Sequence, residues 1–344
     1  DLLMQTLIPS NTGYSYQYQN FGQTSNKGIE FALNAVLVDK KDFGLNFNFN
    51  IAYNRNKIDK LNLDNPWQSS NWSGSTISKY EDYRVEEGGR LGEIWGYKMN
   101  GYYTVAQYDA DGNYLKGDLV LNEKGEWALV DGKKDKSKDL FGGNLYPGVP
   151  KVQVDKDGNP IKQRLGNTVA PTTGGFGFDG RVGNFDFNIF FNYSLGNKLI
   201  NGTKLANSFY AGSSKNYNLV ADFNLANRYT WIDPENGLNL GRPSSSTIAS
   251  YGGVEAVMAR LNEINQGRNM YNPAGVTAMQ LIDYAVEDAS FLRLQNVTVG
   301  YTLPKKWVKA LQIENIRIYF TGYNLFCFTG YDVYDPEVDT SSKK

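Results

Sequence analysis

The sequence contains no histidine and a single cysteine, Cys327, among its 344 residues. Histidine is the commonest general base and zinc ligand, so its absence argues against most hydrolytic and zinc chemistry. One cysteine excludes an internal disulfide, and we interpret Cys327 as a small apolar filler. No nucleophile motif or carboxylate-pair motif is recognisable. The sequence therefore indicates that the protein is not an enzyme.

Long apolar runs and net charge are also lacking. No run of 18 or more apolar residues occurs, which excludes a transmembrane helix. The formal net charge of −1 gives no overall field that would attract nucleic acid. Aromatic residues nevertheless reach 14%, while the mean hydropathy stays at −0.48. This combination is typical of a membrane β-barrel wall, where lipid-facing and lumen-facing residues alternate.

The segment 43–58 shows this alternation most clearly. Because successive side chains of a strand point to opposite faces, it predicts a strand with one apolar and one amide-lined face. The run of about ten residues matches the length of a strand that crosses a bilayer. A soluble sandwich strand also alternates, but its outer face usually mixes Lys, Glu and Thr. The two faces carry Leu45, Phe47, Phe49, Ile51 and Tyr53 on one side, and Asn46, Asn48, Asn50, Ala52 and Asn54 on the other.

Further strands are predicted on the same grounds. Residues 28–38 form a hairpin with 43–58, and residues 174–182 form a second hairpin with 185–195. Two last strands are expected at 292–303 and 313–323. The apolar period slips by one residue over 292–295, which a bulge or emergence of the strand from the membrane would explain. Residues 8–25 are rich in Asn, Gly, Ser and Gln and are interpreted as turns. One short amphipathic helix is expected at 254–264.

Several short motifs, taken in order, resemble the C-terminal part of the SusC/RagA-type TonB-dependent outer-membrane transporters of the Bacteroidetes. Each motif is weak alone, but the ordered set covers nearly the whole chain. The matching stretches are Asn26-Lys27-Gly28-Ile29-Glu30, Glu87-Gly88, Ile94-Trp95-Gly96-Tyr97, Gly117-Asp118, Asp155-Lys156-Asp157-Gly158, Gly166-Asn167, Pro171, Gly174-Gly175-Phe176, Ala289-Ser290-Phe291-Leu292-Arg293-Leu294, Gly300-Tyr301-Thr302-Leu303-Pro304, Asn324-Leu325-Phe326 and Tyr334-Asp335-Pro336-Glu337-Val338.

The resemblance implies an all-β fold: the C-terminal part of a plugged transmembrane antiparallel β-barrel of about 22 strands in the outer membrane. It implies long extracellular loops, which we place at 105–173 and at 198–290, the latter with the short helix. The start of the chain resembles no signal peptide, so we expect 1–344 to belong to a longer polypeptide. The family's plug, TonB-contacting segment, N-terminal strands and closing strand are not in this sequence.

The implied function is TonB-energised import of an oligosaccharide or peptide through the outer membrane. The resemblance implies a SusD-like surface lipoprotein as a lid, together with TonB, outer-membrane lipid and a glycan or peptide substrate as partners, and no nucleic acid. The alternative class is a soluble all-β carbohydrate-binding module that uses tryptophan side chains as platforms.

The candidate binding residues fall into three sets. Aromatic faces in loops are natural platforms for sugars or peptide side chains, although packing between loops explains them as well. Polar residues of the strands would line the lumen, where they would contact the substrate or the plug. These two sets are Trp67, Trp72, Trp95 and Trp127 in loops, and Glu30, Asn46, Asn48, Asn50, Asp186, Asn188 and Asn192 in strands.

The third set is a candidate calcium site. Asp155, Asp157 and Asn159 place three oxygen ligands at alternate positions, with Gly158 for the bend, as oxygen-ligated calcium turns require. An ordinary Asp/Asn/Gly turn accounts for the same residues. No cofactor is required by the sequence, and calcium is the one ion that it suggests.

Overall fold

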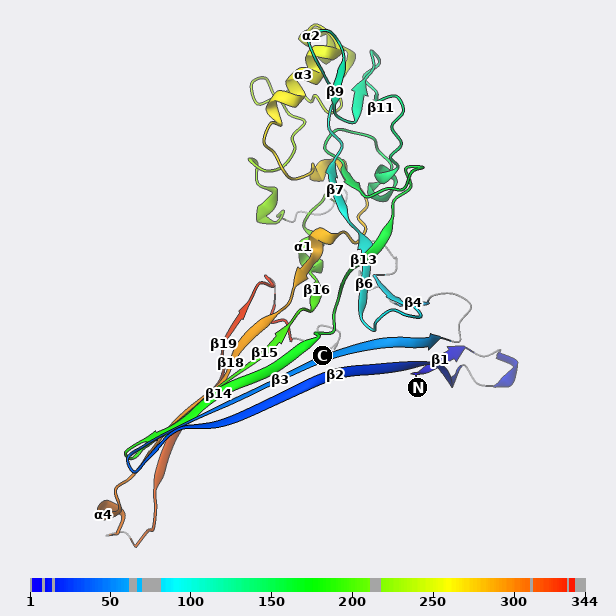
Figure 1. The fold of residues 1–344 in the computed structure, drawn as a ribbon. Helices are drawn as coiled ribbons and strands as arrows, with labels where there is room; N and C mark the ends of the chain where they lie inside the picture. The colour runs from blue at the N-terminus through cyan, green and yellow to red at the C-terminus, as the bar shows by residue number, and fades with distance from the viewer. Residues whose placement is uncertain are drawn as a thin grey trace.

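The alternating segments form one long, curved antiparallel sheet (Figure 1). The computed structural model describes residues 2–7, 10–13, 16–61, 67–69, 82–210, 218–309, 312–332 and 334–337. Within them the sheet has the order β1-β2-β3-β14-β15-β18-β19. Its strands are β1 (Leu2–Leu7), β2 (Tyr16–Lys40), β3 (Phe43–Leu61), β14 (Thr172–Val182), β15 (Phe185–Leu195), β18 (Phe291–Thr302) and β19 (Arg317–Thr329).

The strand register places the apolar side chains of the central strands mostly on one face and the polar ones on the other, with Phe190 as an exception on the polar face. Phe49 lies opposite Leu33 and Phe176, and Phe176 lies opposite Phe191. Residues directly opposite each other in an antiparallel sheet share a face, so these side chains form one apolar surface. Its rings touch across strands, as in the stacked pair Phe176 and Phe191, whose centroids are 5.0 Å apart.

Among the residues that the structure describes, the buried core cluster does not cover this apolar face. Phe31 is 54% exposed and Phe320 is 76% exposed, and many large apolar side chains of β2, β15 and β19 are similarly open. Soluble proteins rarely expose apolar patches of more than a few hundred Å². The sheet therefore presents a surface that suits an apolar solvent.

The buried core lies instead in a lobe at one end of the sheet (Figure 1). It draws on two distant segments, 94–152 and 200–285, whose side chains pack into one cluster. The lobe strands are β4 (Trp67–Ser69), β5 (Tyr83–Val85), β6 (Glu93–Tyr97), β7 (Met99–Tyr102), β8 (Gln107–Tyr108), β9 (Tyr114–Lys116), β10 (Leu119–Leu121), β11 (Trp127–Leu129), β12 (Pro150–Val152), β13 (Lys162–Asn167), β16 (Lys198–Ile200) and β17 (Val286–Asp288).

The helices are short. In the part of the chain that the structure describes they are α1 (Gly202–Ala206), α2 (Ser245–Tyr251), α3 (Val254–Ile264) and α4 (Lys305–Val308), with 3₁₀ turns η1 (Ser10–Thr12), η2 (Ser137–Phe141), η3 (Ala221–Phe223), η4 (Pro273–Gly275) and η5 (Asp283–Ala285). None of these helices is long and apolar enough to span a membrane.

Most strand predictions are confirmed, including the bulge near Leu292, and the differences lie at the ends of the sheet and in the helices. The bulge exists: Leu294 pairs with Phe326 and Asn296 with Tyr323, and Asn324 between them has φ 52°. The prediction of turns at 8–25 is wrong from Tyr16 onward, because β2 continues there and pairs with β1 from Tyr16 and with the far end of β3 from Gly22. The last strand begins at Arg317, later than predicted. The helix at 254–264 is confirmed as α3, but α1, α2 and α4 were not predicted.

Candidate functional site

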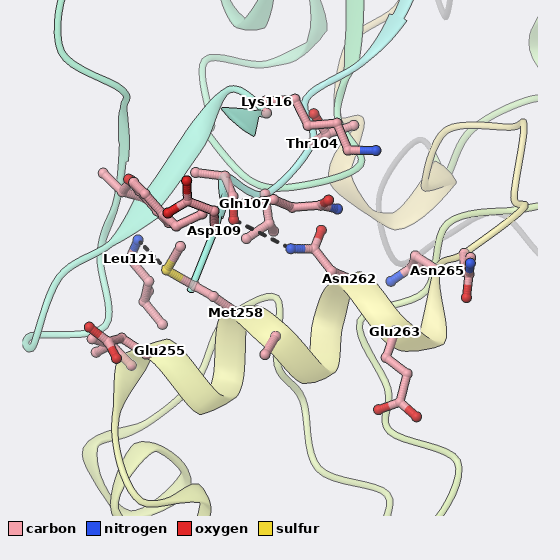
Figure 2. A pocket seen from close by; sticks show the side chains of 18 of the residues that line it. Thr104, Gln107, Asp109, Lys116, Leu121, Glu255, Met258, Asn262, Glu263 and Asn265 are labelled. Carbon is pink, nitrogen blue, oxygen red and sulfur yellow. Dashed lines mark hydrogen bonds between the residues drawn. The ribbon is translucent and has the colours of Figure 1, made fainter. Parts of the chain in front are cut away.

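A groove of about 1220 Å³ opens in the lobe between α3 and the β8–β9 hairpin (Figure 2). One wall is the segment 102–121, which carries the hairpin, and the other is α3 with the residues that follow it. Two contacts join the walls: the Leu121 N–H donates to the Met258 Sδ at 3.4 Å, and the Asn262 side-chain amide donates to the Ala106 carbonyl at 3.4 Å. The groove therefore has a closed floor and an open rim.

Helix α3 faces the groove with one stripe and the core with the other. Val257 and Leu261 are fully buried, whereas Glu255, Ala259 and Glu263 are exposed along the other edge of the helix, four residues apart. Figure 2 shows Met258 and Asn262 directed into the groove and Glu263 directed away from it. The helix is thus an amphipathic element that forms one groove wall through Met258 and Asn262.

An ion-pair cluster on the far side fixes α3 in place. The Arg260 guanidinium donates to both carboxylate oxygens of Asp233, at 2.8 and 2.9 Å, and the Tyr251 hydroxyl donates to the same carboxylate at 2.6 Å. The hydrogen bonds from Arg260, which contribute most, and the hydrogen bond from Tyr251 lower the pKa of Asp233 despite its burial. A pair of hydrogen bonds from one guanidinium to both oxygens of one carboxylate fixes the orientation of α3 relative to the segment that carries Asp233.

The opposite wall is fixed by Asp118. Its carboxylate accepts from the Thr104 N–H at 3.0 Å, from Lys151 at 2.9 Å and from Lys133 at 3.1 Å. Burial opposes ionisation, but the Thr104 N–H and the two lysines together lower the pKa of Asp118. Gly117 beside it has φ +107° and a Cβ there would lie 2.4 Å from the Val105 carbonyl, so only glycine fits.

Asp118→Asn is expected to destabilise the lobe at neutral pH by about 3 kcal/mol, because it leaves the Lys151 ammonium, whose side chain is only 14% exposed, without its carboxylate partner. A carboxyl with a lowered folded pKa adds stability above its unfolded pKa of about 3.9 and loses it as the pH falls through the folded value. The difference between the two proteins should therefore shrink below about pH 4. Denaturant titrations followed by tryptophan fluorescence measure this, since Trp127 and Trp231 lie in the lobe core. An equal difference at pH 7 and pH 3 would contradict it.

Tyr229 lines the groove and is only 3% exposed. Its ring packs edge-on against Tyr102, with centroids 5.3 Å apart. Among the described residues its buried hydroxyl has no hydrogen-bond partner. A buried hydroxyl without a partner is costly, so it marks a place where a ligand or water can contribute an acceptor. No feature of the sequence pointed to Tyr229 or to this groove.

The predicted lumen residues share one face of the sheet. The residues opposite Asn46, Asn48 and Asn50 on β14 are Asp179, Gly177 and Gly175. The same face continues across β15 and β18 through the residues that pair with them. The Asn46 amide donates to Asp179 at 2.8 Å, and Asp186 pairs with Arg317. Glu30, Asn188 and Asn192 belong to the same face by register. That this face lines a lumen stays a prediction.

At the lobe end of the polar face, Arg293 is 7% exposed and binds the segment that follows β19. Its guanidinium donates to both oxygens of Asp335, at 2.7 and 2.6 Å, and lies 2.9 Å from Glu337. The Asp335-Pro336-Glu337 motif therefore folds back onto the sheet. The sequence marked this motif by resemblance but did not predict its partner.

Of the four predicted tryptophan platforms, the structure describes the side chains of two, Trp95 and Trp127. Trp127 is buried and its indole donates to the Gly241 carbonyl at 2.9 Å, so packing between loops describes it better than an open platform. Trp95 is half-buried, and the Arg84 guanidinium covers its ring at 4.4 Å. Trp67 begins β4, but its side chain and the whole of Trp72 lie outside the described residues.

The candidate calcium residues form a self-contained turn. One Asp155 carboxylate oxygen accepts from the Asp157 and Asn159 N–H groups at 2.8 and 2.9 Å, and Lys136 donates to the Asn159 side-chain oxygen at 2.7 Å. Hydrogen bonds from Asn159 lower the pKa of Asp155. Among the described residues, no three carboxylate, cysteine or histidine side chains gather as a metal site would need. The turn alternative accounts for these contacts, and calcium here stays a prediction.

Calorimetry would decide the calcium question. If Asp155, Asp157 and Asn159 ligate calcium, the ion must displace Lys136 from Asn159, and Asp157→Ala should abolish the heat of binding. Lys136→Ala should leave calcium binding unchanged or make it stronger. Identical heats for the parent and Asp157→Ala would leave only a turn.

Comparison with known proteins shows what this chain is similar to. No family model matches the chain. It is 27% identical to the TonB-dependent receptor SusC of Bacteroides thetaiotaomicron, over 98% of the chain and 26% of the relative. It is also 27% identical to a TonB-dependent receptor of Formosa agariphila, over 98% of the chain and 28% of the relative. The chain is a relative of the SusC/RagA-type TonB-dependent receptors.

Solved structures agree with this relation at the level of the fold. The RagAB peptide importer in its closed-closed state superposes with a TM-score of 0.60 at 22% identity, over 98% of this chain and 29% of that chain. The RagAB peptide transporter gives a TM-score of 0.57 at 20% identity, over 97% of this chain and 29% of that chain. The chain matches the C-terminal part of the SusC/RagA-type receptors, as predicted, and spans only 26–30% of the curated relatives' length. These relatives are named as receptors and importers, not as enzymes.

Proposed function

We propose that this chain forms part of the wall and the extracellular surface of an outer-membrane importer. The single observation that carries the proposal is the seven-stranded sheet, which in the described part of the chain has one largely exposed apolar face and one polar face, while the buried core cluster lies in the lobe. A bilayer is the solvent that makes such an apolar face stable. The sheet would be a segment of a closed, plugged barrel of about 22 strands.

In this proposal the polar face lines the lumen. Asn48, Asn50 and Asn192 carry amides that hydrogen-bond either a polar substrate or a plug, and Phe190 lies among them over Gly175 and Gly177. A Cβ on Gly175 would come within 2.5 Å of the Phe190 ring, so glycine makes room for that ring. The lobe, formed by the predicted long loops, would lie outside the cell.

The remaining parts of the proposal follow from the relatives. RagAB is a peptide importer, and the SusC relatives are TonB-dependent receptors. We propose nutrient import energised by TonB, with a SusD-like lipoprotein over the extracellular side, and a peptide or oligosaccharide as the substrate. A soluble carbohydrate-binding module is disfavoured, because Trp127 is buried and the sheet exposes apolar side chains.

Uptake by intact cells tests this function. Deleting the gene should abolish accumulation of one class of labelled oligosaccharide or peptide, and a protonophore should abolish it in the parent strain. Complementation should restore it. A deletion strain that accumulates every offered oligosaccharide and peptide at the parental rate would contradict import.

A further inference from the structure

We propose that three cationic side chains at the lobe end of the apolar face, Lys27, Arg55 and Arg90, bind the phosphate group of an anionic lipid. We call these three residues the cationic rim. The inference goes beyond the import function and takes from it only that the apolar face meets lipid. Three observations carry it: the depth of the residues on that face, two like charges directly opposite each other, and a half-buried guanidinium without a partner.

The first two residues of the cationic rim lie just past the apolar stretch of their strands. On β3 that stretch runs from Leu45 to Tyr53, which is close to the roughly 9–11 residues with which a tilted strand crosses a bilayer. Arg55 is the next residue on the same face, and Lys27 follows Ile29 in the same way on β2. Tyrosine is enriched where hydrocarbon meets head groups. Arg55 and Lys27 therefore lie at head-group depth.

The strand register places these two cations directly opposite each other. Lys27 pairs with Arg55, one step beyond the pair of Ile29 and Tyr53, so both side chains lie on one face. Both are exposed, and among the described residues neither forms an ion pair. Like charges in such a pair destabilise a sheet, and an anion between them would remove the repulsion.

Arg90 adds a third cation from the segment that follows β5. This segment is held against β3 beside Arg55 by two hydrogen bonds. The Ile58 N–H donates to the Gly89 carbonyl at 2.9 Å, and the Leu91 N–H donates to the Asn56 side-chain oxygen at 2.8 Å. The position of Arg90 is therefore fixed by the strand that carries Arg55.

The Arg90 guanidinium lacks an acceptor. Its Nε and Nη2 atoms are buried and have no hydrogen-bond partner among the described residues. Burial lowers the pKa of Arg90, and the nearby charges of Arg55 and Arg164 lower it further. Glu93 acts in the opposite direction, but its carboxylate already accepts from Arg164 at 3.1 Å and from the Arg90 N–H at 3.2 Å. Arginine binds phosphate through parallel N–H donors, as Nε and Nη2 provide.

The far end of the same hairpin has no such excess of positive charge. Lys40 and Lys41 are flanked there by Asp39 and Asp42, and Asp39 also pairs with Arg181 at 3.5 Å. The cationic rim is thus a property of the lobe end of the sheet.

The surroundings favour a phosphate that is carried by a lipid over a free phosphate ion. Ile29 is 77% exposed and Tyr53 is 47% exposed, and both lie next to the cations on the apolar face. Acyl chains attached to the bound phosphate would cover these side chains, whereas a free ion would leave them open.

Native mass spectrometry of the complete transporter tests this proposal. The protein in a neutral detergent is offered equal amounts of dioleoyl phosphatidic acid and dioleoyl phosphatidylcholine, which share their chains and differ in the head group. We expect preferential retention of phosphatidic acid. Lys27→Gln, Arg55→Gln and Arg90→Gln should each weaken it about fivefold, the effect of one cation near an anionic surface. Equal retention of both lipids, or parental retention in all three variants, would overturn the proposal.

Two controls locate the site and its ligand. Lys41→Gln removes the same charge from an exposed position at the far end of the hairpin and should retain phosphatidic acid like the parent. An equal loss in Lys41→Gln and Arg55→Gln would show a net-charge effect and overturn the site. Inorganic phosphate should not displace the lipid; complete displacement would mean that the ligand is the free ion.

Thermal stability gives a readout that a purely structural role of Arg55 would not produce. Without lipid, Arg55→Gln should raise the melting temperature, because it removes the repulsion from Lys27. With phosphatidic acid, the parent should be the more stable protein. A lower melting temperature of Arg55→Gln in both conditions would contradict the site.

Lipid retention is measured without transport. Preferential retention without cellular uptake would therefore contradict import alone, and parental uptake without preferential retention would contradict the cationic rim alone.

Discussion

Phe49→Arg is expected to destabilise the membrane-inserted protein by about 2–4 kcal/mol, whereas Asn48→Arg should cost about 1 kcal/mol or less. Phe49 lies in the middle of the apolar face, opposite Leu33 and Phe176, where an arginine would have to enter hydrocarbon. Asn48 lies on the polar face opposite Gly177, where a longer polar side chain can extend into water.

Reversible unfolding of the complete transporter in lipid vesicles measures both costs. The adjacent pair is its own control, because the two substitutions share their strand, their depth and their introduced residue. Equal costs, or a larger cost for Asn48→Arg, would show that the polar face and not the apolar face meets lipid.

The second large effect is that residues 1–344 alone should give no conducting pore. Within the described part, β1 and β19 form the edges of the sheet and do not pair with each other. In hydrocarbon every unpaired backbone N–H and C=O costs several kcal/mol, and an open edge leaves several of them. That total exceeds the usual stability of a domain, about 5–15 kcal/mol.

The chain expressed by itself should therefore aggregate in liposomes or remain in detergent without conductance. Planar-bilayer recording and semi-native electrophoresis provide the measurement, with the complete transporter as the comparison. A monodisperse, heat-modifiable species with steady single-channel conductance would show that the sheet closes on itself and would refute the open-edge argument.

Part of this architecture was predictable because its signal is local. Alternation with a period of two assigns each side chain of β3 to a face without reference to any other strand. The same alternation in β14 and β15, and the slip near Leu292, set the register that the sheet then shows. The turn prediction before Ser25 failed because composition alone hid a strand that depends on pairing with β3.

The lobe was largely unpredictable because its contacts are non-local. Asp118 binds lysines 15 and 33 residues away, and Trp127 donates to a carbonyl 114 residues away. Tyr229 reaches the groove through a core that joins 94–152 to 200–285. Short strands and irregular segments carry little periodicity, so no pattern in either segment indicated that they meet.

The sequence by itself determined that the chain forms a two-faced antiparallel sheet, since each strand's apolar period is a property of ten neighbouring residues. It also indicated the resemblance to the SusC/RagA-type receptors, through motifs spread along nearly the whole chain. Only the tertiary structure decided where the buried core lies, which tryptophans are covered, and that α3 and the β8–β9 hairpin enclose a groove. Those features arise from packing between segments more than 100 residues apart, where loop closure and side-chain fit, and not local propensity, select the conformation.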